Sequence, residues 1–197
     1  ITTLEKQGLQ HLVTGVTAGA RPALIHTAFE KLNKPVYILT SNLLQAQRLV
    51  EDFSALAGSD NVYYYPADEF IAADMTMASP ELRAQRILTL DALAHRKVGI
   101  YVIPVAGMRK PMTPLEEWQK HVLQTSVGSE IDMNEWIESL GVMGYTRTEM
   151  VTSPGEFTLR GAIFDVYPPY EENPIRIELF DTEVDSIRTF SAETQRS

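Results

Sequence analysis

Hydrophobic positions in residues 35–105 form three short apolar runs with helical patterns between them. The runs at residues 35–40, 62–65 and 98–105 have the length of buried strands. The spacing between them predicts helices over residues 41–56 and 79–95. Parallel strands need long crossover connections, which run right-handed, so this order predicts a parallel sheet with helices packed on it.

The predicted helices carry start and stop signals. Ser79 is a capping residue, Pro80 takes the first helical position and Glu81 places an acid in the first turn. The earlier helix begins at Ser41 and Asn42 and is expected to stop at Gly58. Its predicted apolar stripe consists of Leu44, Leu49, Phe53 and Leu56.

The pattern changes from residue 108 onward. Two prolines and a short amphipathic helix over residues 115–120 indicate a connector. Asp132 is expected to cap a helix that Gly144 ends. The other elements expected in this part are strands, over residues 122–126, 145–151, 157–167, 175–180 and 184–190.

Residues 12–22 have the layout of a phosphate-binding loop, with an apolar strand end, a turn at Gly15 and then a helix. A working loop ends in glycine, lysine and serine or threonine, which hold the phosphates and Mg²⁺. Here these positions are Ala20, Arg21 and Pro22. Ala20 adds a Cβ in a tight turn, and Pro22 removes both the hydroxyl and an N–H donor. The loop is therefore expected to bind no nucleotide, whether it is degenerate or a plain strand–turn–helix that never bound one.

These observations predict an α/β fold in two parts. Residues 1–120 would form a partial parallel sheet with helices, like that of a P-loop NTPase with a degenerate loop. Residues 121–197 would form a small antiparallel α+β module. The chain lacks an initiating Met, which suggests a piece of a longer protein.

Composition excludes several function classes. No apolar run approaches the ~18 residues of a membrane span, and the start has no secretory signal. The absence of cysteine excludes disulfides and thiolate chemistry and fits a cytoplasmic location. A net charge of −9 argues against binding of nucleic acid by this piece alone. No metal site is expected, because the four histidines are scattered without ligand-spaced partners: His11, His26, His95 and His121. No pair of acids stands out as a catalytic dyad.

One strand of the second module has an unusual polar face. Alternation puts Ile175, Ile177 and Leu179 toward the core, and Arg176, Glu178 and Phe180 on the opposite face. Arginine beside an aromatic residue is typical of protein-interaction hot spots.

A second arginine has a similar setting. Arg160 is expected opposite Phe157, Leu159 and Ile163, with Gly161 marking a bulge or a close backbone approach. The alternative is that Arg160 and Arg176 only pair with nearby acids such as Glu178 or Asp185.

The second module also resembles known proteins. The runs GEFTLRGAIFDVYP at residues 155–168 and IRIELFDTEVDSIR at residues 175–188 are similar to those of bacterial nucleotide-excision-repair proteins. Two groups share this architecture: UvrB, and the UvrB-like part of transcription-repair coupling factors. The run at residues 193–197 is typical of the second group. UvrB keeps an intact P-loop and inserts a long DNA-clamping hairpin, for which residues 66–78 are too few.

The resemblance implies a role in transcription-coupled repair. Proteins of this group recognise RNA polymerase stalled at a lesion, displace it with an ATP-driven translocase elsewhere in the chain, and recruit UvrA. Contacts with RNA polymerase and DNA would then lie in other parts of the parent protein. The UvrA contact would use Arg160, Arg176 and Phe180, and this piece would need no cofactor and catalyse no reaction. The alternative is an ATP-binding, helicase-like domain of a UvrB-type protein.

Overall fold

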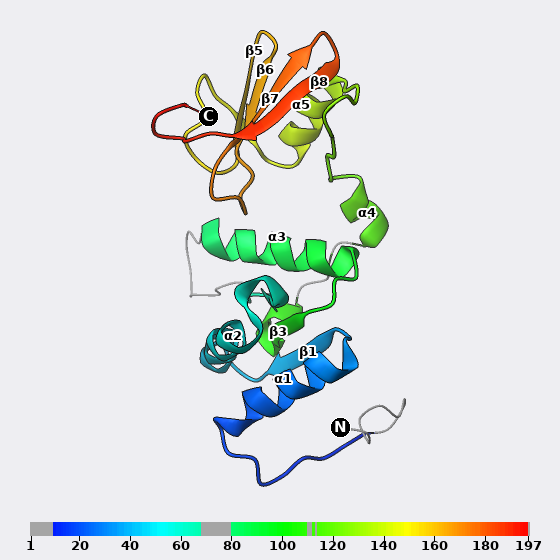
Figure 1. Cartoon of the computed structure of the whole chain (residues 1–197), viewed down its shortest axis with the longest axis vertical. Helices are drawn as coiled ribbons and strands as arrows, with labels where there is room; N and C mark the ends of the chain where they lie inside the picture. The colour runs from blue at the N-terminus through cyan, green and yellow to red at the C-terminus, as the bar shows by residue number, and fades with distance from the viewer. Residues whose placement is uncertain (1–9, 68–79, 110–111, 113, 197) are drawn as a thin grey trace. The chain divides into compact units, whose positions relative to one another are not determined.

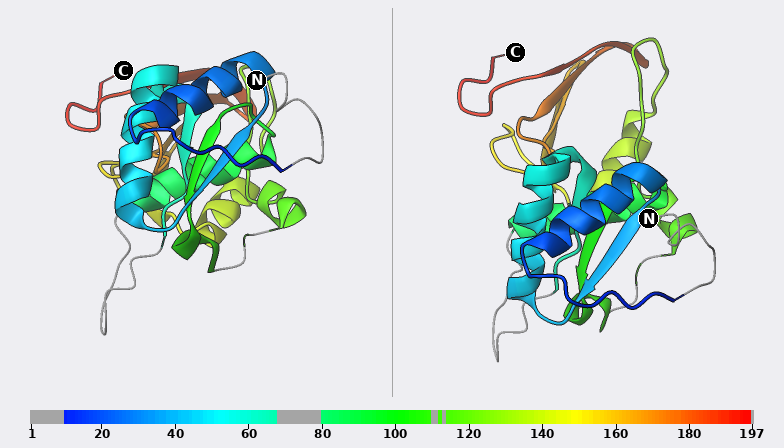
Figure 2. Two further views of the ribbon diagram at one scale, coloured as in Figure 1. Left: turned by 90° about the horizontal axis from the view of Figure 1, so that it is seen from below. Right: turned by 60° about the horizontal axis from the view of Figure 1, so that its bottom comes forward.

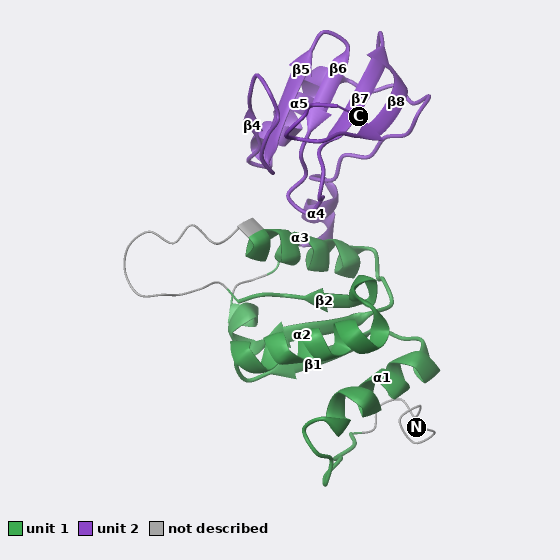
Figure 3. Cartoon of the chain, turned by 60° about the vertical axis from the view of Figure 1, so that its left-hand side comes forward, with its two compact units in different colours: residues 1–112 green, residues 113–197 purple. Residues whose placement is uncertain are grey.

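The computed structural model describes residues 10–67, 80–109, 112 and 114–196. They divide between two compact units, Ile1–Met112 and Thr113–Ser197 (Figure 3). This division places the short connector helix in the second unit, whereas the sequence predicts a boundary after residue 120. Ser79 and most of the predicted 66–78 interval lie outside the described residues. Within the described residues, no helix has the length and apolarity needed to cross a membrane.

The first unit is a parallel sheet with helices, as predicted (Figures 1 and 2). Its strands lie in the order β1-β3-β2 and are β1 (Val36–Thr40), β2 (Val62–Tyr64) and β3 (Ile100–Pro104). Its helices are α1 (Ala20–Leu32), α2 (Leu43–Ala57) and α3 (Pro80–Ala94), with 3-10 turns at Ser59–Asn61 and Val105–Arg109.

Helix α2 shows how the sequence determines where a helix begins and ends and which side chains it buries. The Asn42 side chain accepts a hydrogen bond from the Gln45 N–H, and Gly58 ends the helix at a φ of 82°. Phe53 is fully buried against the sheet, as predicted. Leu44 and Leu56 are 58% and 45% exposed, so their assignment to the apolar stripe is wrong. The helix faces the sheet through Ala46, Val50 and Ala57 together with the predicted Leu49 and Phe53.

The second unit consists of one five-stranded sheet, the helix α5 (Met133–Val142) packed against it, and a short helix α4 (Leu115–Gln119). Its strands, in sheet order, are β4 (Thr146–Arg147), β5 (Glu156–Arg160), β6 (Ile163–Val166), β7 (Ile175–Phe180) and β8 (Glu183–Thr189). Neighbours from β5 to β8 are antiparallel, and β4 pairs with β5 in parallel.

Three predicted strands of this unit differ from the structure. Residues 157–167 form a hairpin of β5 and β6 rather than one strand, because Gly161 turns the chain at a φ of 61°. A Cβ on Gly161 would meet nothing within 4 Å, so the glycine marks neither a bulge nor a close approach. Residues 122–126 form no strand, and residues 145–151 are a strand only at Thr146–Arg147.

The loop that follows β4 is held by Glu156. The carboxylate of this residue accepts hydrogen bonds from the N–H groups of Thr152 and Ser153 at 2.8 and 2.9 Å. These bonds lower the pKa of Glu156. The chain therefore turns just after the end of the predicted 145–151 strand.

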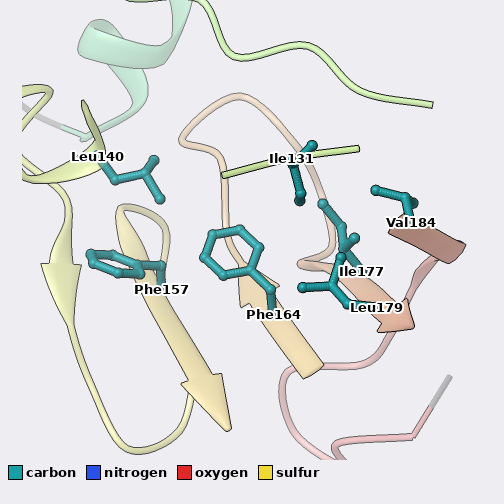
Figure 4. Packing of buried hydrophobic residues seen from close by; sticks show 7 residues of the cluster. All are labelled: Ile131, Leu140, Phe157, Phe164, Ile177, Leu179 and Val184. Carbon is teal, nitrogen blue, oxygen red and sulfur yellow. The ribbon is translucent and has the colours of Figure 1, made fainter. Parts of the chain in front are cut away.

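Helix α5 covers one face of this sheet and completes the core (Figure 4). Asp132 caps the helix by accepting from the N–H groups of Asn134 and Glu135. Trp136 meets Phe164 edge to face, with the ring centroids 5.8 Å apart. The buried apolar side chains of this core cluster are Ile131, Leu140, Phe157, Phe164, Ile177, Leu179 and Val184. The opposite face of the sheet, called the outer face below, carries the charged side chains.

The pairing of β7 with β8 is irregular. Glu178 lies opposite Ser186, but Leu179 lies opposite Val184. Asp185 is therefore an extra residue on β8, forming a bulge. The bulge allows Val184 to be fully buried in the core although Ser186, two positions later, lies on the outer face.

Candidate protein-interaction site

The strand register brings both predicted arginines to the outer face around one carboxylate. Asp165 on β6 lies opposite Thr158 on β5 and opposite Arg176 on β7. Arg160 is two residues beyond Thr158, so its side chain emerges on the same face. The predicted placement of Arg160 and Arg176 on one surface is therefore reproduced by the fold.

Asp165 joins the two arginines directly. It is fully buried, and both of its carboxylate oxygens accept hydrogen bonds. Arg176 donates from Nε to Oδ1 at 2.7 Å and from Nη2 to Oδ2 at 2.8 Å. Arg160 donates from Nη2 to Oδ2 at 3.0 Å. This is a bidentate pair with a second guanidinium at its edge, the strongest arrangement for arginine and carboxylate.

Arg176 is held on several sides. Its side chain is only 14% exposed, and its guanidinium carbon lies 4.3 Å from the centre of the buried Phe190 ring. Its Nη1 points to the carbonyl of Gln195 at 3.4 Å. Hydrogen bonding to Asp165 raises the pKa of Arg176. Arg176 thus stays charged while most of its surface is covered.

Arg160 and Phe180 face outward at the same end of the sheet. Arg160 ends β5 beside the 161–162 turn, and Phe180 ends β7 beside the 181–182 turn. Arg160 is level with Glu178 across β6, so Phe180 lies two strands away and two residues further along β7, at roughly 12 Å between Cα atoms. The Phe180 side chain is 79% exposed and that of Arg160 is 46% exposed. A large apolar ring beside a partly free cation can bind another protein.

The two arginines do form ion pairs, but not with the expected acids. Glu178 forms an ion pair with Arg188 and accepts a hydrogen bond from Ser186. Arg160 and Arg176 both form their ion pairs with Asp165. Sequence reasoning missed Asp165, which sits inside the apolar run Ala162–Val166. Because side chains alternate along a strand, an acid directly after the core residue Phe164 points to the opposite face of the sheet. This alternation could have identified Asp165 as a residue of the outer face.

The glycine loop of the first unit differs from a phosphate cradle. Residues 10–19 contain no strand, and Leu12 and Val13 are 90% and 57% exposed, so the predicted apolar strand end is wrong. Gly15 does turn the chain at a φ of 75°, and α1 begins at Ala20. The N–H groups of Ala20 and Arg21 both donate to the Thr17 carbonyl, at 3.1 and 3.2 Å.

Titratable side chains of the described residues do not gather in a metal-binding geometry. Across the described parts of the chain, no three His, Asp or Glu residues form a cluster that could hold a metal ion. His95 contacts Asp91, and His121 contacts Glu117, each within one helical turn. The outer face of the second unit therefore remains the candidate site.

Comparison with known proteins identifies the class of the second unit. Residues 123–197 match the family model of the UvrB interaction domain. This range contains α5, the whole five-stranded sheet and the Asp165 cluster. The second unit is therefore similar to UvrB interaction domains over most of its length.

Similarity also extends across the first unit. The chain is 42% identical over 188 residues to the transcription-repair-coupling factor of Bacillus subtilis (strain 168), covering 95% of this chain. It is 43% identical over 186 residues to that of Staphylococcus haemolyticus (strain JCSC1435). The chain spans 16% of the length of each relative. It aligns with the N-terminal region of these transcription-repair-coupling factors.

Proposed function

We propose that this chain recruits UvrA in transcription-coupled nucleotide excision repair. The second unit would bind UvrA through the outer face of its sheet, with Arg160, Arg176 and Phe180 at the contact. The parent protein would engage RNA polymerase and DNA through other parts and hydrolyse ATP there. Arg160 and Phe180 supply exposed contact surface, and Arg176 contributes from a largely buried position.

The observation that carries this proposal is the exposure of Phe180. A phenylalanine that is 79% exposed on a structured strand leaves its ring in water, although burial of such a ring is worth roughly 1.5–3 kcal/mol. The neighbouring cluster has two positive charges and one negative charge, so it keeps one net positive charge. Such a surface suits a partner that offers an apolar pocket edged by carboxylates.

We propose no catalysis and no nucleotide binding for the first unit. The first N–H groups of α1 are occupied by the Thr17 carbonyl, and Pro22 has no N–H. Neither a phosphate-binding backbone nor a Mg²⁺-binding hydroxyl is supplied at these positions. These features weigh against the ATP-binding, helicase-like alternative.

Replacing Phe180 tests the UvrA contact. Truncation of a hot-spot residue costs about 2 kcal/mol or more, so Phe180→Ala should raise the Kd for purified UvrA at least ~20-fold in titration calorimetry. Val142→Ala is the matched control, because Val142 is 69% exposed but lies on α5, which covers the opposite face. The control should change the Kd less than ~2-fold. Equal affinities of Phe180→Ala and the parent would refute the proposed contact.

A further inference from the structure

We propose that Asp165 is a positioning residue of the UvrA-binding surface, which fixes Arg160 in the orientation that the partner meets. This inference rests on the proposed function and assigns a role to a residue that does not itself reach the surface. Asp165 is fully buried, so any effect it has on binding must pass through the groups that it holds.

The geometry gives the two arginines different tasks. Arg176 donates hydrogen bonds from Nε and Nη2 to Asp165, and its guanidinium packs on the ring of Phe190. Among the described residues, Arg160 donates one side-chain hydrogen bond, to Asp165 Oδ2. A guanidinium has five N–H donors, so most of those on Arg160 remain for a partner's carboxylate. Arg176 secures the carboxylate, and the carboxylate secures Arg160.

This arrangement reduces the entropic cost of binding. A free arginine side chain samples many rotamers, and binding must select one of them. The bond to Asp165 selects a rotamer in advance, because Asp165 itself cannot move while Arg176 holds both of its oxygens. The negative charge also offsets the repulsion between two guanidinium groups that share one face.

The variant Asp165→Asn tests this role with little change of shape. Asparagine keeps one acceptor oxygen but loses the charge and replaces the other acceptor with a donor, which faces the guanidinium groups. The Kd for UvrA should rise about tenfold, within the range of couplings between residues in contact. Combining the change with Arg160→Ala gives a double-mutant cycle. If Asp165 acts through Arg160, Asp165→Asn should add less than ~2-fold in the Arg160→Ala background.

The outcomes separate this inference from the proposed function. If Arg160→Ala and Phe180→Ala both bind UvrA like the parent, the proposed function fails. If Arg160→Ala binds weakly while Asp165→Asn binds like the parent, the proposed function stands and the positioning role is refuted. Equal losses from Asp165→Asn with and without Arg160 would also refute it, since Asp165 would then not act through Arg160.

A measurement on the unmodified chain decides the case in which Asp165→Asn fails to fold. Nuclear magnetic resonance relaxation of the Arg160 Nε–H reports the mobility of this side chain without UvrA. A positioned guanidinium should approach the rigid backbone order parameter of about 0.85. A value below ~0.6, typical of flexible groups, would overturn the proposal.

Discussion

In sequence, the glycine loop of the first unit has the layout of a phosphate-binding motif, and the outer face of the second unit has the residue pattern of a protein contact. The structure joins the predicted residues into one cluster only on the outer face. At residues 15–22 the expected turn and helix form, yet the N–H groups of Ala20 and Arg21 donate to the Thr17 carbonyl, and the described residues 10–19 before the helix contain no strand. On the outer face, three strands bring Asp165, Arg160 and Arg176 into one hydrogen-bonded cluster. A local motif thus says less about function than residues from separate strands that meet in the fold.

The largest effect should come from Arg176→Ala. This change leaves the buried Asp165 carboxylate without its bidentate partner, and breaking such a pair typically costs ~3–5 kcal/mol. Urea unfolding followed by tryptophan fluorescence reports the second unit, because Trp118 and Trp136 both lie in it. Arg188→Ala is the control, since its pair with Glu178 is partly exposed and should be worth ~1 kcal/mol or less. Similar losses for both variants would contradict the structural role of Arg176.

Arg160→Ala should have a smaller effect on stability. Arg176 still binds both oxygens of Asp165, and Arg160 is nearly half exposed, so the loss should be about 1 kcal/mol. The same urea titration measures it. A loss as large as that of Arg176→Ala would mean that the two arginines share the carboxylate equally, and that Arg160 is structural.

The smallest effect should be that of Mg-ATP on the first unit. Millimolar Mg-ATP should leave the thermal unfolding of the chain unchanged, measured by differential scanning fluorimetry. Mg-ATP should also leave unchanged the thermal unfolding of a variant with Ala20→Gly, Arg21→Lys and Pro22→Ser, because Leu12 and Val13 before the loop are exposed and residues 10–19 form no strand. Ligand at 100 times its Kd would stabilise the fold by ~2.7 kcal/mol. A clear shift for the parent chain would restore the ATP-binding alternative.

The sequence is informative where one local rule decides the structure. Apolar runs give β1, β2 and β3, and the caps Asn42 and Asp132 mark the starts of α2 and α5. The alternation in β7 correctly puts Ile177 and Leu179 in the core and Phe180 on the outer face.

It is less informative where partners from distant strands decide. The β5–β6 hairpin reads as one strand because its apolar alternation continues across Gly161. The Asp165 cluster depends on the register of β6 against β7, and the alternation of side chains within one strand does not reveal that register. Arg176 and Phe180 look equivalent in sequence, yet the first is largely covered by Asp165 and Phe190 and the second is exposed.

The bulge at Asp185 determines which side chains of β8 face the core and which face outward. A strand presents its side chains in steps of two, and the extra residue shifts that count by one between Ser186 and Val184. Deleting Asp185 would act like a frameshift: Val184 would leave the core or the remainder of β8 would turn over. Substituting the exposed Asp185 changes no frame and should be tolerated. At this position, the presence of a residue matters more than its identity.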